Sequence, residues 1–359
     1  NTDGGFPTQK LFGPFNKNDD WYQTYDSVND ASEVLGNGVG YRAARDASED
    51  MTIGTTFTFT GGVNTGNVDV SIVTQGNNYE IWNLIGNPYS SYITLDDFLA
   101  ANNTNFNTQS AGVYGYNAQA TDKWEIWNQA YSDNYEFENP GLELFITPGQ
   151  GFFVASKTGG ATIGFTPSMR TTGNSDDFIS GRNTTNSISH LKLKVTKTSE
   201  LYVTDFYFTN NASLGLDVGY EAGIFGDVAP DFAIFSQLVN DNQGVDMAIQ
   251  SVSISDLENN IIIPLGINSQ AGEQLIVSIE QSSLAENINV YLEDTVANTI
   301  TLLNTNDFVM TPITNLNDVG RFFLRFENET LSTIENEFEG LVIFNTNSPK
   351  VLHIKGQLL

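Results

Sequence analysis

Turn-forming residues interrupt this chain at short intervals, and this spacing constrains its fold more than any other feature. Asn, Gly, Asp, Ser and Thr separate short runs rich in Val, Ile, Thr and Phe about every 8–12 residues, a pattern typical of β-sandwiches. Helical periodicity is almost absent. The one helix expected is Leu95–Ala101, with Thr94 as its N-cap and Asp96 and Asp97 in the first turn, where carboxylates favour the helix dipole. Capping is the expected role of this acidic pair, and a metal or acid–base site is the functional alternative.

The strand-like runs fall into two series. A stretch rich in Thr, Gly, Asn, Ser and Asp at 171–187 separates them and predicts a linker or long loop. The second series opens with His190–Lys197, in which apolar and polar residues alternate as in a half-buried strand. The predicted fold is all-β. It consists of two tandem antiparallel β-sandwich (jelly-roll-like) domains at 1–182 and 183–330, followed by a truncated β sorting domain at 331–359.

Composition excludes several classes of function. The chain carries 43 acidic and 15 basic residues, a net charge of −28, so phosphate backbones and anionic membrane surfaces would be repelled. We therefore expect no nucleic-acid partner. No apolar run approaches the ~18 residues of a transmembrane helix, which predicts no membrane insertion of its own. Cysteine is absent, which rules out disulfides and thiolate metal sites.

The C-terminal tail reads as the start of a small β unit. Two apolar runs, Leu341–Phe344 and Val351–Ile354, flank a polar turn at Asn345–Pro349. The second run alternates with a period of two, as a half-buried strand does. A two-stranded fragment is marginal alone, so the unit is expected to be cut short at Leu359.

This tail resembles the C-terminal sorting domain of proteins that Bacteroidetes export by type IX secretion. Ile334–Phe338 is similar to the acidic linker of that domain, and the two apolar runs are similar to its first strands. The turn departs from the usual Pro-Asn-Pro, since it keeps only Pro349. The resemblance implies the following sorting-signal residues: Glu335, Phe338, Leu341, Ile343, Leu352 and Ile354.

Further segments resemble modules that precede such a tail, and they fall in the usual order. This co-linearity is more specific than any single motif. The segments are Trp82–Ser90, Thr147–Val154, Thr166–Arg170, Gly219–Gly223, Val290–Asp294 and Arg321–Phe326.

The resemblance implies a non-catalytic region of a cell-surface or secreted protein, exported across the outer membrane. Its β modules would serve as a stalk or adhesin, of the kind associated with gliding. The implied partners are the type IX secretion translocon and a PorV-type outer-membrane shuttle protein. A strand pair with open edges could dock by adding to another sheet.

A carbohydrate-binding module, or an appendage of an upstream glycosidase or peptidase, is the alternative. Glycans would then be the partner, stacked on Trp82, Trp124 or Trp127. Trp124 and Trp127 are three residues apart and would face opposite sides of a strand. Packing in a sandwich core is therefore the expected position of these rings.

Two other kinds of site have short signatures. Asn16, Asn18 and Asp20 alternate as in a calcium loop but lack its glycine and its twelfth-position glutamate. We expect no cofactor, and calcium is the alternative. Ser27 and Thr295 each follow Asp and precede Val, which matches the O-glycosylation pattern of exported Bacteroidetes proteins.

Catalysis has little support in the sequence. The two histidines, His190 and His353, lie in strand-like runs, and no nucleophile elbow, zinc-protease or phosphate-loop motif occurs. The prediction is that the chain is not an enzyme. A glycosidase would need only two facing carboxylates, so this alternative stays open.

Overall fold

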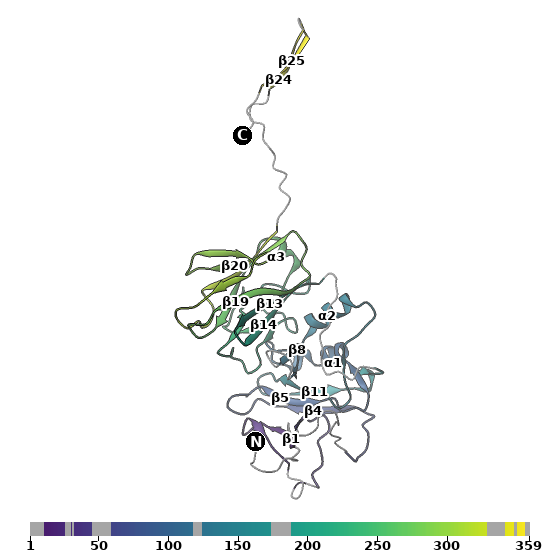
Figure 1. The fold of residues 1–359 in the computed structure, drawn as a ribbon. Helices are drawn as coiled ribbons and strands as arrows, with labels where there is room; N and C mark the ends of the chain where they lie inside the picture. Colours follow the sequence, from purple (N-terminus) through teal and green to yellow (C-terminus); the bar gives the residue numbers. More distant parts are fainter. Residues whose placement is uncertain are drawn as a thin grey trace, which may run out of the picture.

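The computed structural model describes residues 11–25, 30, 32–44, 59–117, 124–173, 188–328, 342–347 and 350–355. These residues are predominantly β, as predicted. Figure 1 shows an N-terminal half (described residues 11–173), a C-terminal half (188–328) and a separate strand pair near the C-terminus. No described helix is long and apolar enough to cross a bilayer.

Four small sheets build the N-terminal half. Their strand orders are β2-β1-β3, β5-β10-β7-β8, β11-β4 and β12-β6-β9. The strands are β1 (Leu11–Asn16), β2 (Trp21–Tyr22), β3 (Tyr41–Ala44), β4 (Val68–Ile72), β5 (Trp82–Gly86), β6 (Tyr92–Thr94), β7 (Val113–Tyr116), β8 (Trp124–Trp127), β9 (Phe145–Ile146), β10 (Gly151–Ala155), β11 (Ala161–Phe165) and β12 (Arg170–Thr171).

The sheet β5-β10-β7-β8 is covered on both faces, which explains its nearly continuous apolar strands. On β10, Phe152 and Val154 enter one core, which also holds residues of β4, β11 and helix α1 (Leu95–Asn102). Phe153 and Ala155 enter a second core on the opposite face. This alternation is the period of two that any strand imposes on its side chains.

One sheet of eleven strands makes up the C-terminal half. Its order is β21-β20-β23-β18-β16-β17-β14-β13-β19-β22, with β15 paired to β17. Only residues 303–307 separate the two edge strands, β21 and β22, so the sheet curves until it nearly closes. The strands are β13 (Ser189–Lys197), β14 (Glu200–Phe208), β15 (Ala222–Gly223), β16 (Ala233–Ser236), β17 (Met247–Val252), β18 (Ile262–Asn268), β19 (Leu275–Ser282), β20 (Ile288–Asp294), β21 (Thr299–Leu302), β22 (Phe308–Met310) and β23 (Phe322–Asn328).

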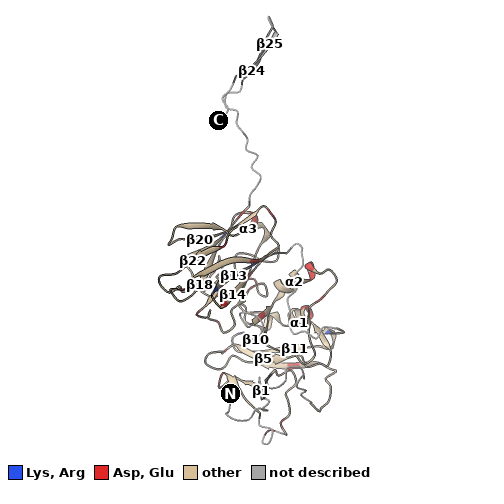
Figure 2. Cartoon of the chain, in the orientation of Figure 1, with Lys and Arg blue, Asp and Glu red and all other residues tan. Residues whose placement is uncertain are grey.

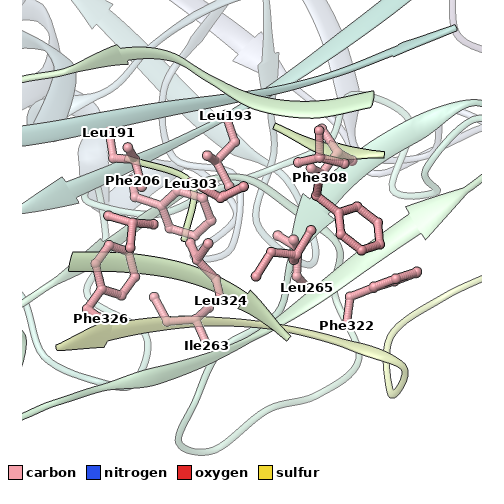
Figure 3. Close-up of a cluster of buried hydrophobic side chains, with 14 of the residues drawn as sticks. Leu191, Leu193, Phe206, Ile263, Leu265, Leu303, Phe308, Phe322, Leu324 and Phe326 are labelled. Carbon is pink, nitrogen blue, oxygen red and sulfur yellow. The ribbon is translucent and has the colours of Figure 1, made fainter. Parts of the chain in front are cut away.

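Inward-facing residues of this curved sheet form the largest core. On β13, Leu191, Leu193 and Val195 are fully buried and the lysines between them are not, as the sequence pattern predicts. Figure 3 shows Leu191 and Leu193 above Leu324 and Phe326 of β23, with the Phe206 ring between them.

Three helices accompany the sheets. The predicted helix is confirmed as α1, with Thr94 at its N-cap position. Helices α2 (Gln129–Glu138) and α3 (Ile254–Glu258) were not predicted. The buried positions of α2 are mostly polar, so it lacks the apolar stripe by which an amphipathic helix is identified. The side chains of Asn128 and Ser253 cap the two helices by accepting backbone N–H bonds.

The two halves share a buried core, which we call the seam. It is made by residues of β5, β7, β10 and α2 from the N-terminal half and of β14, β15 and β17 from the C-terminal half. Its buried members are Trp82, Tyr114, Ala130, Phe153, Ala155, Ile188, Tyr207, Ala222 and Ile249. The predicted boundaries at residues 182 and 330 both lie outside the described residues and stay predictions.

Phe225 is the most connected ring of the seam. It comes from the C-terminal half and stacks on Trp124 at a centroid distance of 3.9 Å. Trp82 and Phe153 lie at 4.5 and 5.1 Å. Tyr79, at 5.6 Å, completes an aromatic socket contributed by the N-terminal half. Aromatic pairs in such geometry add to the stabilisation from buried area.

A bidentate ion pair fixes the β20–β23 ladder. The Arg321 guanidinium donates to both carboxylate oxygens of Asp294, at 2.8 and 2.6 Å. The backbone N–H groups of Val296 and Ala297 also donate to Asp294, which is only 1% exposed. Burial opposes ionisation, but the hydrogen bonds and charge of Arg321, together with the two backbone N–H bonds, outweigh it and hold the pKa of Asp294 below its ordinary value.

The C-terminal strand pair forms a two-stranded sheet of its own. It consists of β24 (Val342–Asn347) and β25 (Lys350–Lys355), antiparallel, with Ile343 opposite Ile354. The predicted run Val351–Ile354 lies within β25.

Acidic residues are spread over both halves of the described chain, and Figure 2 shows no large basic stretch.

We expect Phe225→Ala to lower the free energy of unfolding by roughly 3 kcal/mol, because it empties the aromatic socket. Urea unfolding followed by tryptophan fluorescence measures the change. Phe137→Ala, at a ring 38% exposed on α2, is the control and should cost roughly 0.5 kcal/mol. Equal effects of the two substitutions would contradict the central role of Phe225.

We expect Arg321→Met to cost about 3 kcal/mol at pH 7, because it leaves the buried Asp294 carboxylate without its cation. The folded-state pKa of Asp294 is depressed, so this stabilisation is present above the unfolded value of 3.8 and is lost as the pH falls below it. Thermal unfolding from pH 3 to pH 7 tests both points. Arg325→Met, on β23, is the control. It breaks the more exposed ion pair between Arg325 and Glu293 and should cost under about 1 kcal/mol.

Candidate functional site

The segment Gly219–Gly223, one of the family-like motifs, lies at the seam and bonds to the N-terminal half. The N–H of Gln129 donates to the Gly219 carbonyl at 2.8 Å. The Tyr114 hydroxyl donates to the Gly223 carbonyl at the same distance. The Tyr220 hydroxyl donates to Asp133 at 2.9 Å, and burial raises the pKa of Tyr220 to about 12. The motif therefore acts as a polar clamp beside the aromatic socket.

The Trp82–Ser90 and Thr147–Val154 motifs also have structural contacts. The Asn87 amide donates to the carbonyls of Ser91, Ile146 and Thr147, and its oxygen accepts the Tyr89 N–H. One buried side chain thus closes a turn and ties it to the next motif along the chain. A turn-forming role, as Asn and Pro favour, accounts for these residues without a ligand.

Titratable groups of both halves gather beside the seam. His190 and Asp205 form a buried pair, with His190 Nε2 2.6 Å from Asp205 Oδ1. Lys192 Nζ lies 3.5 Å from the same oxygen. Burial opposes ionisation of Asp205, but the Lys192 charge and the His190 hydrogen bond prevail and lower its pKa. Across the seam, burial raises the pKa of Glu125.

The His190–Asp205 pair resembles the base and its orienting carboxylate in a catalytic site, but the described residues supply no nucleophile to it. His190 stacks on Tyr207 at 4.7 Å, and its Nδ1 has no hydrogen-bond partner among the described residues. A dyad needs a nucleophile or substrate proton within hydrogen-bond reach of the imidazole. Within the described residues, no serine or threonine hydroxyl is hydrogen-bonded to that ring.

A carboxyl pair joins α1 to α2. Ser132 donates a hydrogen bond to Asp96, and Glu136 shares a hydrogen bond with Asp96. Burial and this bond raise the pKa of Glu136 to about 7. Asp97 instead accepts from Thr94 at 2.7 Å, at the predicted helix start. Within the described residues, no cluster of three His, Cys, Asp or Glu could hold a metal ion.

The tryptophans proposed as sugar platforms lie in the cores. Trp82 and Trp127 are 0% and 3% exposed. Trp124 is half-buried under Phe225. Trp124 packs in the seam and Trp127 in the core on the opposite face, as their spacing predicts. None of the three offers an open ring face, whereas Trp21 is 69% exposed.

Most oxygens of the calcium-like loop accept hydrogen bonds, either within the loop or from residues 75–78, whereas Asp20 Oδ1 is buried and has no hydrogen-bond partner among the described residues. Asp20 accepts from the backbone N–H groups of Asn77 and Asn78, which lowers its pKa. Asn16 donates to Asp19 at 2.7 Å. Asn18 Oδ1 accepts from the amide of Gln75.

The positive charge in this loop comes from Lys17, which binds backbone carbonyls of a neighbouring segment. Lys17 donates to the carbonyls of Tyr79, Glu80 and Trp82 at 2.6–3.0 Å. Burial lowers the pKa of Lys17 to about 8. The loop is thereby fixed to the start of β5, and a metal ion is not required for that attachment.

The remaining predicted sites are placed only in part. Thr295 donates to the Arg321 carbonyl at 2.9 Å, beside the buried Asp294. Ser27, Glu335, Phe338 and Leu341 lie outside the described residues. Ile343 lies on β24, and Leu352 and Ile354 lie on β25.

Glu221, in the seam clamp, was missed by the sequence analysis. It is 0% exposed, and its carboxylate accepts the Asp217 N–H at 2.6 Å. Burial raises its pKa to about 8. No sequence signal distinguishes this glutamate from the many exposed acids of the chain.

We expect Glu221→Gln to stabilise the protein increasingly as the pH rises from 4.5 to about 8. Burial raises the folded pKa above the unfolded 4.5, so the wild type loses stability across this window and the neutral amide does not. Thermal unfolding at pH 4.5 and pH 8 measures the difference. Glu258→Gln, at an exposed residue of α3, controls for the loss of one charge. An equal gain at both pH values would contradict the assignment.

Comparison with known proteins identifies a family for both halves together. The family model described as Domain of unknown function (DUF8693) matches residues 8–326. Comparisons with curated proteins and with solved structures gave no match. The single model runs across the seam and ends just before β23 does. Since it covers well over half of the sequence, the chain belongs to the DUF8693 family.

Proposed function

We propose that the chain is a non-catalytic region of an exported Bacteroidetes surface protein. In this proposal, residues 11–328 are a β-rich stalk or adhesin unit made of two sandwich-like halves. Residues 331–359 are the linker and first strands of a type IX sorting domain. The protein would reside at the cell surface or be released outside the cell.

The separate β24–β25 pair is the observation that carries this proposal. It begins after the family-matched region ends at residue 326, and it belongs to neither half's sheets. A two-stranded sheet has marginal stability in water. Such an element gains stability when a partner sheet adds to one of its open edges. A shuttle protein of the outer membrane, as the motif resemblance implies, is the partner proposed here.

The body of the protein supports a mechanical role rather than a catalytic one. Its motif segments bond to one another and to the seam, as Asn87 and Tyr220 do. The acidic surface favours solubility outside the cell and disfavours nucleic acid. A β-rich body followed by a small C-terminal strand pair is the arrangement expected of an exported protein with a C-terminal sorting signal.

The test deletes Leu331–Leu359 from the native protein in its own cell. We expect the deletion to stop export, measured by surface protease accessibility and by co-purification with outer-membrane partners. Leu352→Asp with Ile354→Asp should have the same effect, because charges at these positions would disfavour burial against a partner. His353→Gln, at the alternate position of the same strand, is the matched control. Export that survives the deletion would show the proposal to be wrong.

A further inference from the structure

The sheet β2-β1-β3 has two very different faces. Phe15 and Tyr22 point toward the body, where they pack on the seam core and Phe15 meets Phe153 at 5.4 Å. Because side chains alternate along a strand, Phe12, Tyr41 and Trp21 lie on the opposite face. Tyr25 lies just after β2 and continues its pairing with β1, since the Tyr25 N–H donates to the Phe12 carbonyl.

Aromatic rings cover this outer face. Phe12 stacks on Tyr41 at 5.0 Å with the planes 10° apart, and Tyr25 lies 6.3 Å from both. Phe59 meets Phe12 at 5.5 Å and is 61% exposed. Trp21, the first residue of β2, lies four residues before Tyr25 in the chain and is 69% exposed. Phe12, Tyr25 and Tyr41 are half-buried, and Trp21 and Phe59 are exposed.

Polar groups accompany the rings. Gln23 is exposed and lies between Trp21 and Tyr25, on the same face by alternation. Asn16 is opposite Trp21 in the ladder. The Tyr41 hydroxyl accepts the Gly36 N–H at 2.8 Å, which fixes its ring. A preorganised aromatic surface with a few convergent polar groups is typical of a ligand site.

The charges around the face decide the class of ligand. Arg42 lies over the Tyr22 ring at 4.9 Å, on the inner face. Lys17 is bound by the carbonyls of Tyr79, Glu80 and Trp82. Neither cation is directed at the outer rings. Asp19 and Glu33 are exposed nearby in the chain. The net charge of −28 would repel an anionic ligand. A second copy of this chain, with its charge of −28, would be repelled as well.

We propose that this outer face binds a neutral polysaccharide. The apolar faces of sugar rings would stack on Trp21, Tyr25 and Tyr41, whose π-faces attract C–H groups. The sugar hydroxyls would bond to the amide of Gln23. This goes beyond the proposed function, since it assigns the ligand of the adhesin unit. It does not depend on the tail, so either proposal can fail alone.

Native gel electrophoresis of the full chain tests the site. The gels contain xylan, galactomannan or a mixed-linkage β-glucan, with alginate as the anionic probe. We expect at least one neutral polymer to retard the wild type and alginate not to. Trp21→Ala and Tyr25→Ala should each weaken binding about tenfold, the loss expected when an aromatic anchor is truncated. Phe137→Ala, an exposed aromatic on α2, is the control and should bind as the wild type does.

Three outcomes would overturn the proposal. The first is that none of the three neutral polymers retards the wild type. The second is that Trp21→Ala, with an unchanged circular dichroism spectrum, binds as tightly as the wild type. The third is a dimer in gel filtration that Trp21→Ala dissociates, which would assign the face to a second copy of the chain.

Discussion

The contact between Phe225 and the aromatic socket of the N-terminal half is the constraint on which the rest of this structure depends. It joins two sets of sheets, together with the hydrogen bonds that the Gly219–Gly223 segment makes to the N-terminal half. With it, Trp82, Trp124 and Phe153 are buried against a ring that lies outside their own half. The sheet β5-β10-β7-β8 then has cores on both faces, and its strands can be apolar throughout. The single family model across residues 8–326 is consistent with one integrated unit.

Much of the fold could be predicted from the sequence, because local patterns determine it. The period of two on β13 predicted which of its residues are buried, and Thr94 with two aspartates predicted α1. Helix α2 could not be predicted this way. Its buried residues, Ser132 and Asn134 among them, are polar, since they pack at a junction with a second helix and another half. The aromatic socket was equally invisible, because it joins residues about 140 positions apart and only tertiary packing brings them together.

The candidate sites were harder to predict than the strands, for a related reason. Tryptophan chemistry indicated sugar stacking, but burial depends on which face a neighbouring element covers. Trp82 and Trp127 are covered, and Trp21 is not. Asn16, Asn18 and Asp20, which have a calcium-like spacing, lie in a loop that Lys17 and Asp20 join to residues 77–82. Glu221 has a raised pKa only because the seam encloses it. Each outcome depends on contacts between segments distant in sequence, which no local pattern encodes.

The position of β23 determines how the protein would transmit force. Asn328 is the last residue of β23, and this strand pairs with β18 on one side and β20 on the other. Tension applied at the C-terminus therefore acts along a strand bonded on both edges. Two hydrogen-bond ladders and the Arg321–Asp294 pair would have to shear together before the strand could be extracted. A load arriving from the outer face of β1 would cross the seam before it reached that strand, so the Phe225 socket and the β23 ladders would bear it in series.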